Sequence, residues 1–175
     1  MATFYSAKVA EDQLQQSRDG EDEDKRKQAS RLNYWVQGSS LTLSDKKRIL
    51  HVVNRSLDPV YVLTLRIKAN EIKGWGDDIH HFTLVVMETP PCSELIFPAA
   101  ELKIMSFEWA GRKFLADAKG GWHVELAAFV DREGAIWQRD QDGIEETDEL
   151  PDAETGSLLG EPHIRKAQKC TDETM

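Results

Sequence analysis

The stretch WHVELAAFVDREGAIWQR, residues 122–139, decides the fold class of this chain. Apolar residues recur at every second position of its first half, as on one face of a β-strand. That face consists of Trp122, Val124, Leu126, Ala128 and Val130. Residues 131–134, Asp-Arg-Glu-Gly, form a turn with glycine where a positive φ is needed, and residues 135–139 return. The pattern predicts a β-hairpin with Leu126 in the core and Glu125 on the opposite face.

Outward from this hairpin, other short segments also have β character. The most regular is Val60–Ile67, where Tyr61, Leu63, Leu65 and Ile67 share one predicted face. Shorter runs are Tyr34–Val36, Ile49–Val53, Phe82–Met87 and Glu94–Phe97. Residues 68–80 are expected to be a loop, and residues 99–119 suit either strands or a short helical turn. Short strands separated by Gly/Pro turns predict a mainly β fold, an antiparallel β-sandwich (Ig-like or similar), with a small barrel as the alternative.

Charge divides the chain into three predicted parts, a helical arm over 1–31, a β-sandwich domain over 32–147 and an acidic tail over 148–175. Residues 32–139 contain 13 acidic and 13 basic residues, whereas residues 140–175 contain 11 acidic and 3 basic ones. Most of the net charge of −9 therefore lies at the C-terminal end. The tail has too few apolar residues to offset the entropy of ordering, so we expect it to be disordered.

The arm is expected to be helical over its second half. Three acid-before-base pairs at i,i+4 support a helix there, Glu21–Lys25, Asp22–Arg26 and Glu23–Lys27. No apolar residue occurs from Gln15 to Gln28, however, and a short helix without an apolar face is marginally stable. Two interpretations stay open, a solvated helix that frays, or a spacer of coiled-coil character that holds the domain away from another surface.

The two cysteines and the lengths of the apolar runs indicate in which cellular compartment the protein is expected. Cys92 and Cys170 lie in very different surroundings, which favours two unpaired thiols in a reducing compartment over a disulfide. No signal peptide is visible, and every apolar run is far shorter than a membrane span. The expected location is the cytoplasm, or alternatively the cytoplasmic face of the membrane. The basic triplets are few and the tail is acidic, so nucleic acid is not an expected partner.

No residue pattern in the sequence strongly indicates a catalytic or metal-binding site. The five histidines have no metal-ligand spacing with another His or Cys. Asp140 and Asp142 match part of a calcium-loop template, but Asp140–Gly143 also reads as a turn before a brief strand at Ile144, and both readings stay open. Asp77 and His80 belong to the one clustered acid/base set, on a predicted polar loop. We therefore predict no catalytic, cofactor-binding or metal-binding residues, and no cofactor.

The loop around residue 75 contains the candidate contact residues. Trp75 is flanked by glycines in a charged segment, unlike the other four tryptophans. It is either a lid folded over the edge of the domain or an exposed contact residue. With Asp77 and Asp78 it forms the candidate site for contact with a protein partner.

The chain resembles a loosely defined class of bacterial, often membrane-associated proteins of unknown function. Its landmarks include Asn54-Arg55-Ser56, Pro59-Val60-Tyr61, Trp137-Gln138-Arg139 and Asp142-Gly143. In that class a charged helical segment follows membrane helices and runs into a small β domain. The resemblance implies no active site, and it implies membrane association only through a partner or a missing N-terminal segment.

The expected function is that of a non-enzymatic interaction or scaffolding module with an unknown protein partner. The alternatives are an enzyme that uses the Asp77/His80 loop, or a regulator that acts through the acidic tail.

Overall fold

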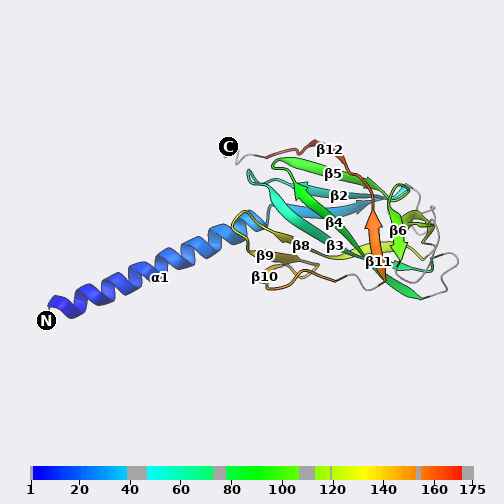
Figure 1. Cartoon of the computed structure of the whole chain (residues 1–175). Coiled ribbons are helices and arrows are strands. Elements are labelled where there is room, and N and C mark those ends of the chain that lie inside the picture. The colour runs from blue at the N-terminus through cyan, green and yellow to red at the C-terminus, as the bar shows by residue number, and fades with distance from the viewer. Residues whose placement is uncertain are drawn as a thin grey trace.

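The computed structural model describes residues 2–38, 47–72, 78–106, 113–118, 120–152 and 155–170. The described part is mainly β, with one long helix, α1 (Ala2–Ala29), at its N-terminus (Figure 1). The strands are β1 (Leu32–Gln37), β2 (Ile49–Asn54), β3 (Val60–Asn70), β4 (Ile79–Thr89), β5 (Ser93–Pro98), β6 (Lys103–Ser106), β7 (Lys113–Phe114), β8 (Trp122–Val130), β9 (Ile136–Arg139), β10 (Ile144–Thr147), β11 (Gly156–Leu159) and β12 (His163–Lys166).

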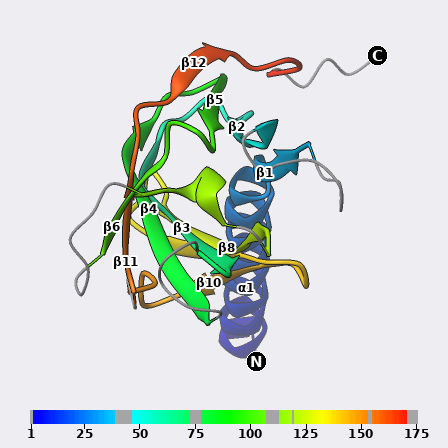
Figure 2. The same cartoon turned by 90° about the vertical axis from the view of Figure 1, so that its right-hand side faces the viewer.

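The strands form two open sheets. The smaller has the order β1-β2-β5-β12 and the larger the order β10-β9-β8-β3-β4-β11-β6-β7. Figure 2 shows β12, β5 and β2 on one side of the domain and β3, β4 and β8 on the other. Strand pairs in both sheets are antiparallel, except that β11 runs parallel to β4. The ambiguous stretch 99–119 contains both elements considered for it, the short strands β6 and β7 and a 3-10 turn, Leu115–Asp117.

One apolar core joins the two sheets. The smaller sheet contributes Leu50, Val52, Leu95 and Phe97, and the larger contributes Leu63, Leu65, Ile67, Phe82, Leu84 and Phe129. Each of these side chains is at most 2% exposed. Burial of apolar surface on this scale is the main favourable term in folding, so the two sheets stabilise each other.

Two β-bulges shift the predicted strand faces. In β8 the partner of Arg66 is Leu126 while the partner of Ile67 is Val124, so Glu125 is the extra residue. The face that begins at Trp122 and Val124 therefore continues at Ala127 and Phe129, both of which are buried. The prediction that Leu126 lies in the core is wrong, because an inserted residue exchanges the two faces beyond it.

The second bulge lies in β3. The register with β8 shifts between Tyr61 and Thr64, and Val62 has a φ of 45°. Leu63, Leu65 and Ile67 face the core as predicted, but Tyr61 is 40% exposed.

The predicted loop over 68–80 is also too long, because β3 extends to Asn70 and β4 begins at Ile79.

The predicted turn at 131–134 is confirmed, and residues 140–143 adopt the turn that was one of two interpretations for them. Gly134 has a φ of 91°, and the Asp131 carboxylate accepts hydrogen bonds from the backbone N–H groups of Glu133 (2.8 Å) and Ala135 (2.9 Å). The same carboxylate accepts the indole N–H of the buried Trp137 at 2.8 Å. The turn over 140–143 leads into β10, which begins at Ile144 as expected.

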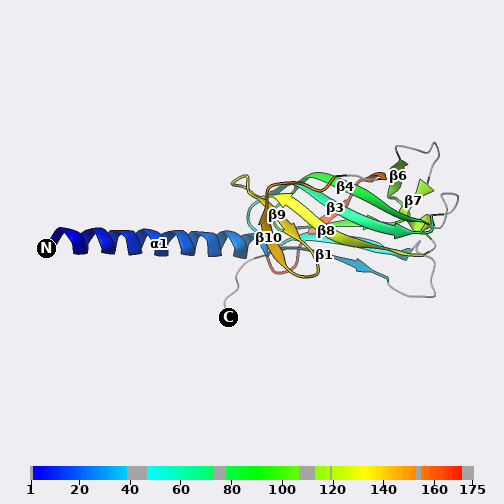
Figure 3. The ribbon, with the colours of Figure 1, turned by 90° about the horizontal axis from the view of Figure 1, so that it is seen from below.

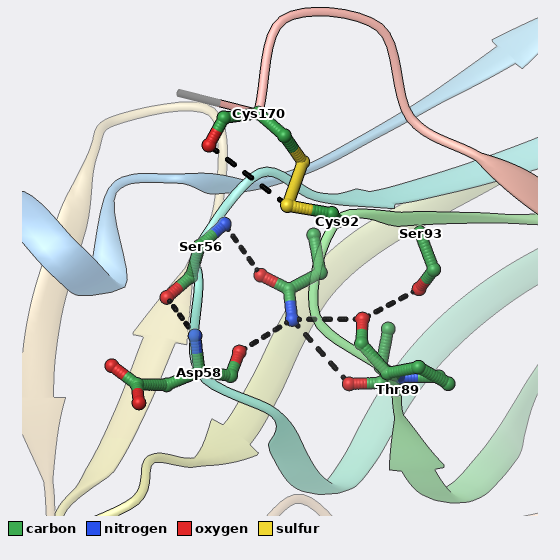
Figure 4. The surroundings of a disulfide bond; sticks show 8 residues. Ser56, Asp58, Thr89, Cys92, Ser93 and Cys170 are labelled. Atoms are coloured by element: carbon green, nitrogen blue, oxygen red, sulfur yellow. Dashed lines mark hydrogen bonds between the residues drawn. A yellow bond between two sulfur atoms is a disulfide. The ribbon is translucent and has the colours of Figure 1, made fainter. Parts of the chain in front are cut away.

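The described residues 155–170 contain two strands where disorder was predicted for the tail. β11 lies between β4 and β6, and β12 pairs with β5 at the edge of the smaller sheet. The prediction failed here because composition does not show long-range pairing, in which backbone hydrogen bonds and two buried side chains, Leu158 and Ala167, order a polar segment. The expected unpaired thiols are also wrong, since Cys92 and Cys170 form a disulfide (Figure 4).

A buried asparagine connects the loops beside this disulfide. The Asn54 amide donates hydrogen bonds to the carbonyl groups of Asp58 (2.9 Å), Pro90 (3.1 Å) and Thr89 (3.4 Å). Its own carbonyl oxygen accepts the N–H of Ser56 at 2.9 Å. The β2–β3 connection is thereby fixed to the β4–β5 turn.

Helix α1 spans 28 residues, about twice the helical length expected from the sequence. It projects from one end of the β domain (Figures 1 and 3). Its C-terminal end is held by a Gln28–Asp58 hydrogen bond and by the Arg139 guanidinium, which donates to the carbonyl of Ser30 at 3.1 Å. Two of the expected i,i+4 ion pairs are present, Glu21–Lys25 and Glu23–Lys27. Among the described residues, no helix has the length and apolar character needed to cross a membrane.

The bulge at Glu125 predicts a clear order of stability for two substitutions in β8. Phe129→Ala should lower the free energy of unfolding by about 3–5 kcal/mol, because it opens a cavity in the core. Leu126→Ala, at a half-buried position on the other face, should cost roughly 1 kcal/mol. Urea unfolding midpoints compare the two, and a larger loss for Leu126→Ala would contradict the bulged register.

The place of Gly156 at the start of β11 predicts a second effect. A Cβ atom at this position would lie 2.2 Å from the carbonyl oxygen of Met105 and 2.8 Å from Cα of Ser106. Gly156→Ala should therefore destabilise the domain by roughly 1–3 kcal/mol through overpacking. The matched control is Gly20→Ala, where nothing lies within 4 Å of the new Cβ and the helix should gain roughly 0.5–1 kcal/mol. Thermal unfolding of the two variants should move in opposite directions.

Candidate functional site

Of the three predicted contact residues, only Asp78 lies among the residues that the structure describes. Trp75 and Asp77 lie outside the described residues, while Asp78 is exposed just before β4. His80 belongs to β4 rather than to a loop, and its half-buried ring lies 6.2 Å from that of Phe82. The Asp77/His80 pair therefore lies partly outside the described residues and stays a prediction.

A large groove lies at the base of the helix. Its volume is about 740 Å³, and it separates the second half of α1 from the β9–β10 hairpin. The lining residues are Asp22, Lys25, Arg26, Trp137, Gln138, Asp140, Asp142, Gly143, Ile144, Glu145 and Glu146. The groove exists because Ser30 and Arg31 form a turn that leads the chain from the helix directly into β1, while β9 and β10 extend alongside the last helical turns. We call it the junction groove.

The charges of the junction groove are unbalanced. Both of its cations already have partners, since the Lys25 ammonium lies 3.1 Å from Glu133 and 3.4 Å from Glu21, and Arg26 donates to the carbonyl of Ile144 at 3.4 Å. The hydrogen bond to Glu133 raises the pKa of Lys25, with a second contribution from Glu21. Five carboxylates also line the groove, those of Asp22, Asp140, Asp142, Glu145 and Glu146. The groove therefore presents net negative charge.

The turn at Asp140 shapes the floor of the groove. One Asp140 carboxylate oxygen accepts the backbone N–H groups of Asp142 at 2.8 Å and Gly143 at 3.1 Å. This geometry is an Asx turn, which accounts for the Asp-x-Asp-Gly pattern without a metal. Among the described residues, no three His, Cys, Asp or Glu side chains are placed to hold a metal ion together.

A second cavity lies on the other side of the same turn. It measures about 490 Å³, shares Asp140 with the junction groove, and is lined by residues of β1, β8 and β9. Within it, burial raises the pKa of the Tyr34 hydroxyl, with a further contribution from Asp140. The Arg139 guanidinium also lines this cavity, and it donates to the side chain of Asn33 at 2.9 Å. Burial lowers the pKa of Arg139.

A buried polar cluster, which we call the His51 cluster, lies on the smaller sheet. His51 Nδ1 lies 2.7 Å from Glu94 Oε1, and His51 Nε2 lies 2.9 Å from Gln37 Oε1. The Trp35 ring stacks on the imidazole, with centroids 4.8 Å apart and an interplanar angle of 1°. Arg165 of β12 binds Glu94 through two hydrogen bonds of 2.7 and 2.9 Å. His51 and Glu94 are buried, and the residues of the cluster come from four neighbouring strands of one sheet.

The arginine dominates the electrostatics of this cluster. Its hydrogen bonds hold the pKa of Glu94 below its ordinary value against the opposing effect of burial, and His51 lowers the pKa further. A bidentate arginine–carboxylate pair is a strong charge-assisted interaction with defined geometry. The His51 cluster thus ties β12 to the sheet.

The sequence-based prediction missed both features for the same reason. The junction groove joins residues 22–26 to residues 137–146, and the His51 cluster joins residues 37, 51, 94 and 165, so neither has a local motif. The one usable signal was a charged residue, Glu94, at the start of an apolar strand. A carboxylate there requires a partner, because an unpaired buried charge is very costly.

Comparisons with known proteins add no relative. No family model, no curated protein and no solved structure matches the chain.

The Arg165–Glu94 pair predicts how stability depends on pH. Because the folded-state pKa of Glu94 lies below its unfolded value, the pair contributes stability above roughly pH 4.3. That contribution is lost as the pH falls through the lower folded value. Glu94→Gln should therefore destabilise the protein at pH 7 and flatten the decline in stability between about pH 5 and pH 3. Urea unfolding across this range measures both, with the exposed Glu88→Gln as the control expected to match the parent.

Proposed function

We propose that this chain is a non-enzymatic interaction module, a β-sandwich domain presented on a helical spacer, with the junction groove as its docking site for a polypeptide partner. The observation that supports this most directly is the groove itself. It is the larger of the two cavities described above, and it lies where two elements distant in sequence meet. Large concave sites at such junctions are common binding sites.

The charge of the groove indicates the chemistry of the partner. Lys25 and Arg26 are held by contacts within the chain, whereas Asp22, Glu145 and Glu146 have no ion pair among the described residues. A partner segment with lysine or arginine side chains would complement this surface and be attracted to it over a distance. Ile144, which is partly exposed at the groove, adds apolar contact for the stems of such side chains.

The helix supports a spacer role. At 28 residues, α1 is about 42 Å long. Its described contacts with the β domain lie near its C-terminal end, through Lys25, Arg26 and Gln28. A helix held at one end places the groove at a set distance from whatever its N-terminal half meets. The resemblance to membrane-associated proteins with a charged segment before a β domain agrees with this arrangement.

A basic peptide tests the proposed docking site. The full chain should bind fluorescein-labelled octalysine, with affinity that falls as salt rises, because the attraction is electrostatic. Glu146→Lys, in the groove, should weaken binding about tenfold, a ratio equivalent to roughly 1.4 kcal/mol. Fluorescence anisotropy titrations at two salt concentrations measure this effect.

The matched control is Glu88→Lys, the same change in charge at an exposed position of β4 outside the groove. It should leave binding within about twofold of the parent, corresponding to less than roughly 0.5 kcal/mol. Equal losses for both variants would show that octalysine senses only overall charge, and this would contradict the proposed site. Octaglutamate of the same length should not bind.

A further inference from the structure

The C-terminal strand β12 is held by contacts that a second copy could supply equally well. Among the described strands, β12 is an edge strand of the smaller sheet and pairs only with β5, and all four of its residues are exposed. Its specific contacts are the bidentate Arg165–Glu94 pair, the exposed His163–Glu101 pair at 3.0 Å, the hydrogen bond from Ala167 N–H to the Cys92 carbonyl at 2.8 Å, and the Cys92–Cys170 disulfide. These contacts join β12 or the residues after it to the segment from Cys92 to Glu101, and a second copy carries the same groups.

The connection to the rest of the chain is short and crosses between sheets. Residues 160–162, Gly-Glu-Pro, link β12 to β11, which belongs to the larger sheet. This link and the disulfide are the covalent connections between β12 and the preceding part of its own chain, whereas a second copy could supply the noncovalent contacts. When the disulfide is open, β12 can leave without breaking the pairing of β11 with β4 and β6. Short hinges of this kind favour exchange of a terminal element between copies.

The surface left behind would be specific for its occupant. The departure of β12 exposes the backbone edge of β5, and an exposed edge is a template for another strand. It also leaves the Glu94 carboxylate without its arginine, inside a cluster where that side chain is only 6% exposed. The incoming strand must therefore present a cation in register with Glu94, and a thiol several residues later beside Cys92.

From this geometry we infer that the β5 edge is a strand-acceptor site and that β12 of a second copy occupies it when the disulfide is opened. A dithiol such as dithiothreitol reduces the disulfide to two thiols and is itself oxidised to a cyclic disulfide. Strand exchange then places Cys170 of one copy beside Cys92 of the other. Oxidised glutathione closes the bond between copies, taking the two thiol hydrogens and leaving two molecules of reduced glutathione. The product is a covalent dimer with exchanged C-terminal strands.

Two single-cysteine variants test this exchange in the full chain. Cys92→Ser retains only Cys170, and Cys170→Ser retains only Cys92, so neither can form the internal disulfide. When equal amounts are mixed at high concentration with oxidised glutathione, the Cys92–Cys170 linkage between copies should exceed both symmetric linkages by far more than random pairing of the two thiols would give. Non-reducing electrophoresis and mass spectrometry of the linked peptides identify the products.

A charge variant separates strand exchange from random collision of thiols. Arg165→Glu, placed in the Cys92→Ser chain, should lower the yield of the mixed linkage about tenfold, because the donor strand then opposes Glu94. Lys166→Glu, the same change on the neighbouring residue, which pairs with Ser93, should leave the yield unchanged. Circular dichroism first confirms that each variant is folded.

The outcomes are distinct. A mixed linkage that depends on Arg165 and not on Lys166 supports the acceptor site. The statistical distribution of the three linkages that random pairing gives, or equal effects of the two charge variants, would show that the thiols meet without strand exchange and would overturn the proposal. A mixture that stays monomeric under these conditions would overturn it as well.

Discussion

The side chain of Asn54 is the contact on which most other features of the domain depend. It is fully buried, and its hydrogen bonds fix the β2–β3 connection against the β4–β5 turn. Figure 4 shows what is attached to these two loops, with Cys92 and the disulfide on one side and Asp58 on the other. The backbone adds a further link, because Cys92 N–H donates to the carbonyl of Ser56 at 3.0 Å. Loss of the Asn54 amide would remove the donor from one buried carbonyl group, that of Thr89, and from two partly buried ones, which is more costly than loss of an exposed hydrogen bond.

The helix depends on the same loop. Asp58 accepts a hydrogen bond from Gln28 with one carboxylate oxygen and from Arg132 with the other. The β2–β3 connection is thereby joined both to the end of α1 and to the β8–β9 turn. The two sides of the junction groove, α1 and the β9–β10 hairpin, are thus held by these contacts and by the Arg26–Ile144 and Lys25–Glu133 pairs. A groove held in this way is preformed, which lowers the entropic cost of binding a partner.

The sequence predicted what is local and missed what is distant. The turn at Asp131–Gly134 was predictable because a carboxylate and a glycine stand at positions that the turn geometry requires. The core residues Leu63, Leu65 and Ile67 followed from alternation alone. Alternation cannot reveal a bulge, however, and this is why Leu126 and Tyr61 were misplaced. Such an error arises from one inserted residue and reverses every position after it.

The C-terminal segment shows the other limit. Its composition favours disorder, yet β11 forms backbone hydrogen bonds with a strand on each of its edges. At position 156, glycine fits beside Met105, where a Cβ atom would clash with the backbone. Pairing partners more than fifty residues away leave no trace in local composition, and the same holds for Glu94 and Arg165. The groove and the His51 cluster could not be predicted, although each of their residues is unremarkable in its own strand or helix.

The Cys92–Cys170 bond also makes a closed covalent ring within the linear chain. Its two cysteines are 78 positions apart, and the ring contains every element from β5 to β12. Such a ring restricts the unfolded chain, and a loop of this length corresponds to about 4.5 kcal/mol in the chain-entropy treatment. That amount is a large fraction of the stability of an ordinary domain, which is about 5–15 kcal/mol. The thiol–disulfide balance of the surroundings would therefore control how long the folded domain survives, and a single proteolytic cut within the ring would release no fragment.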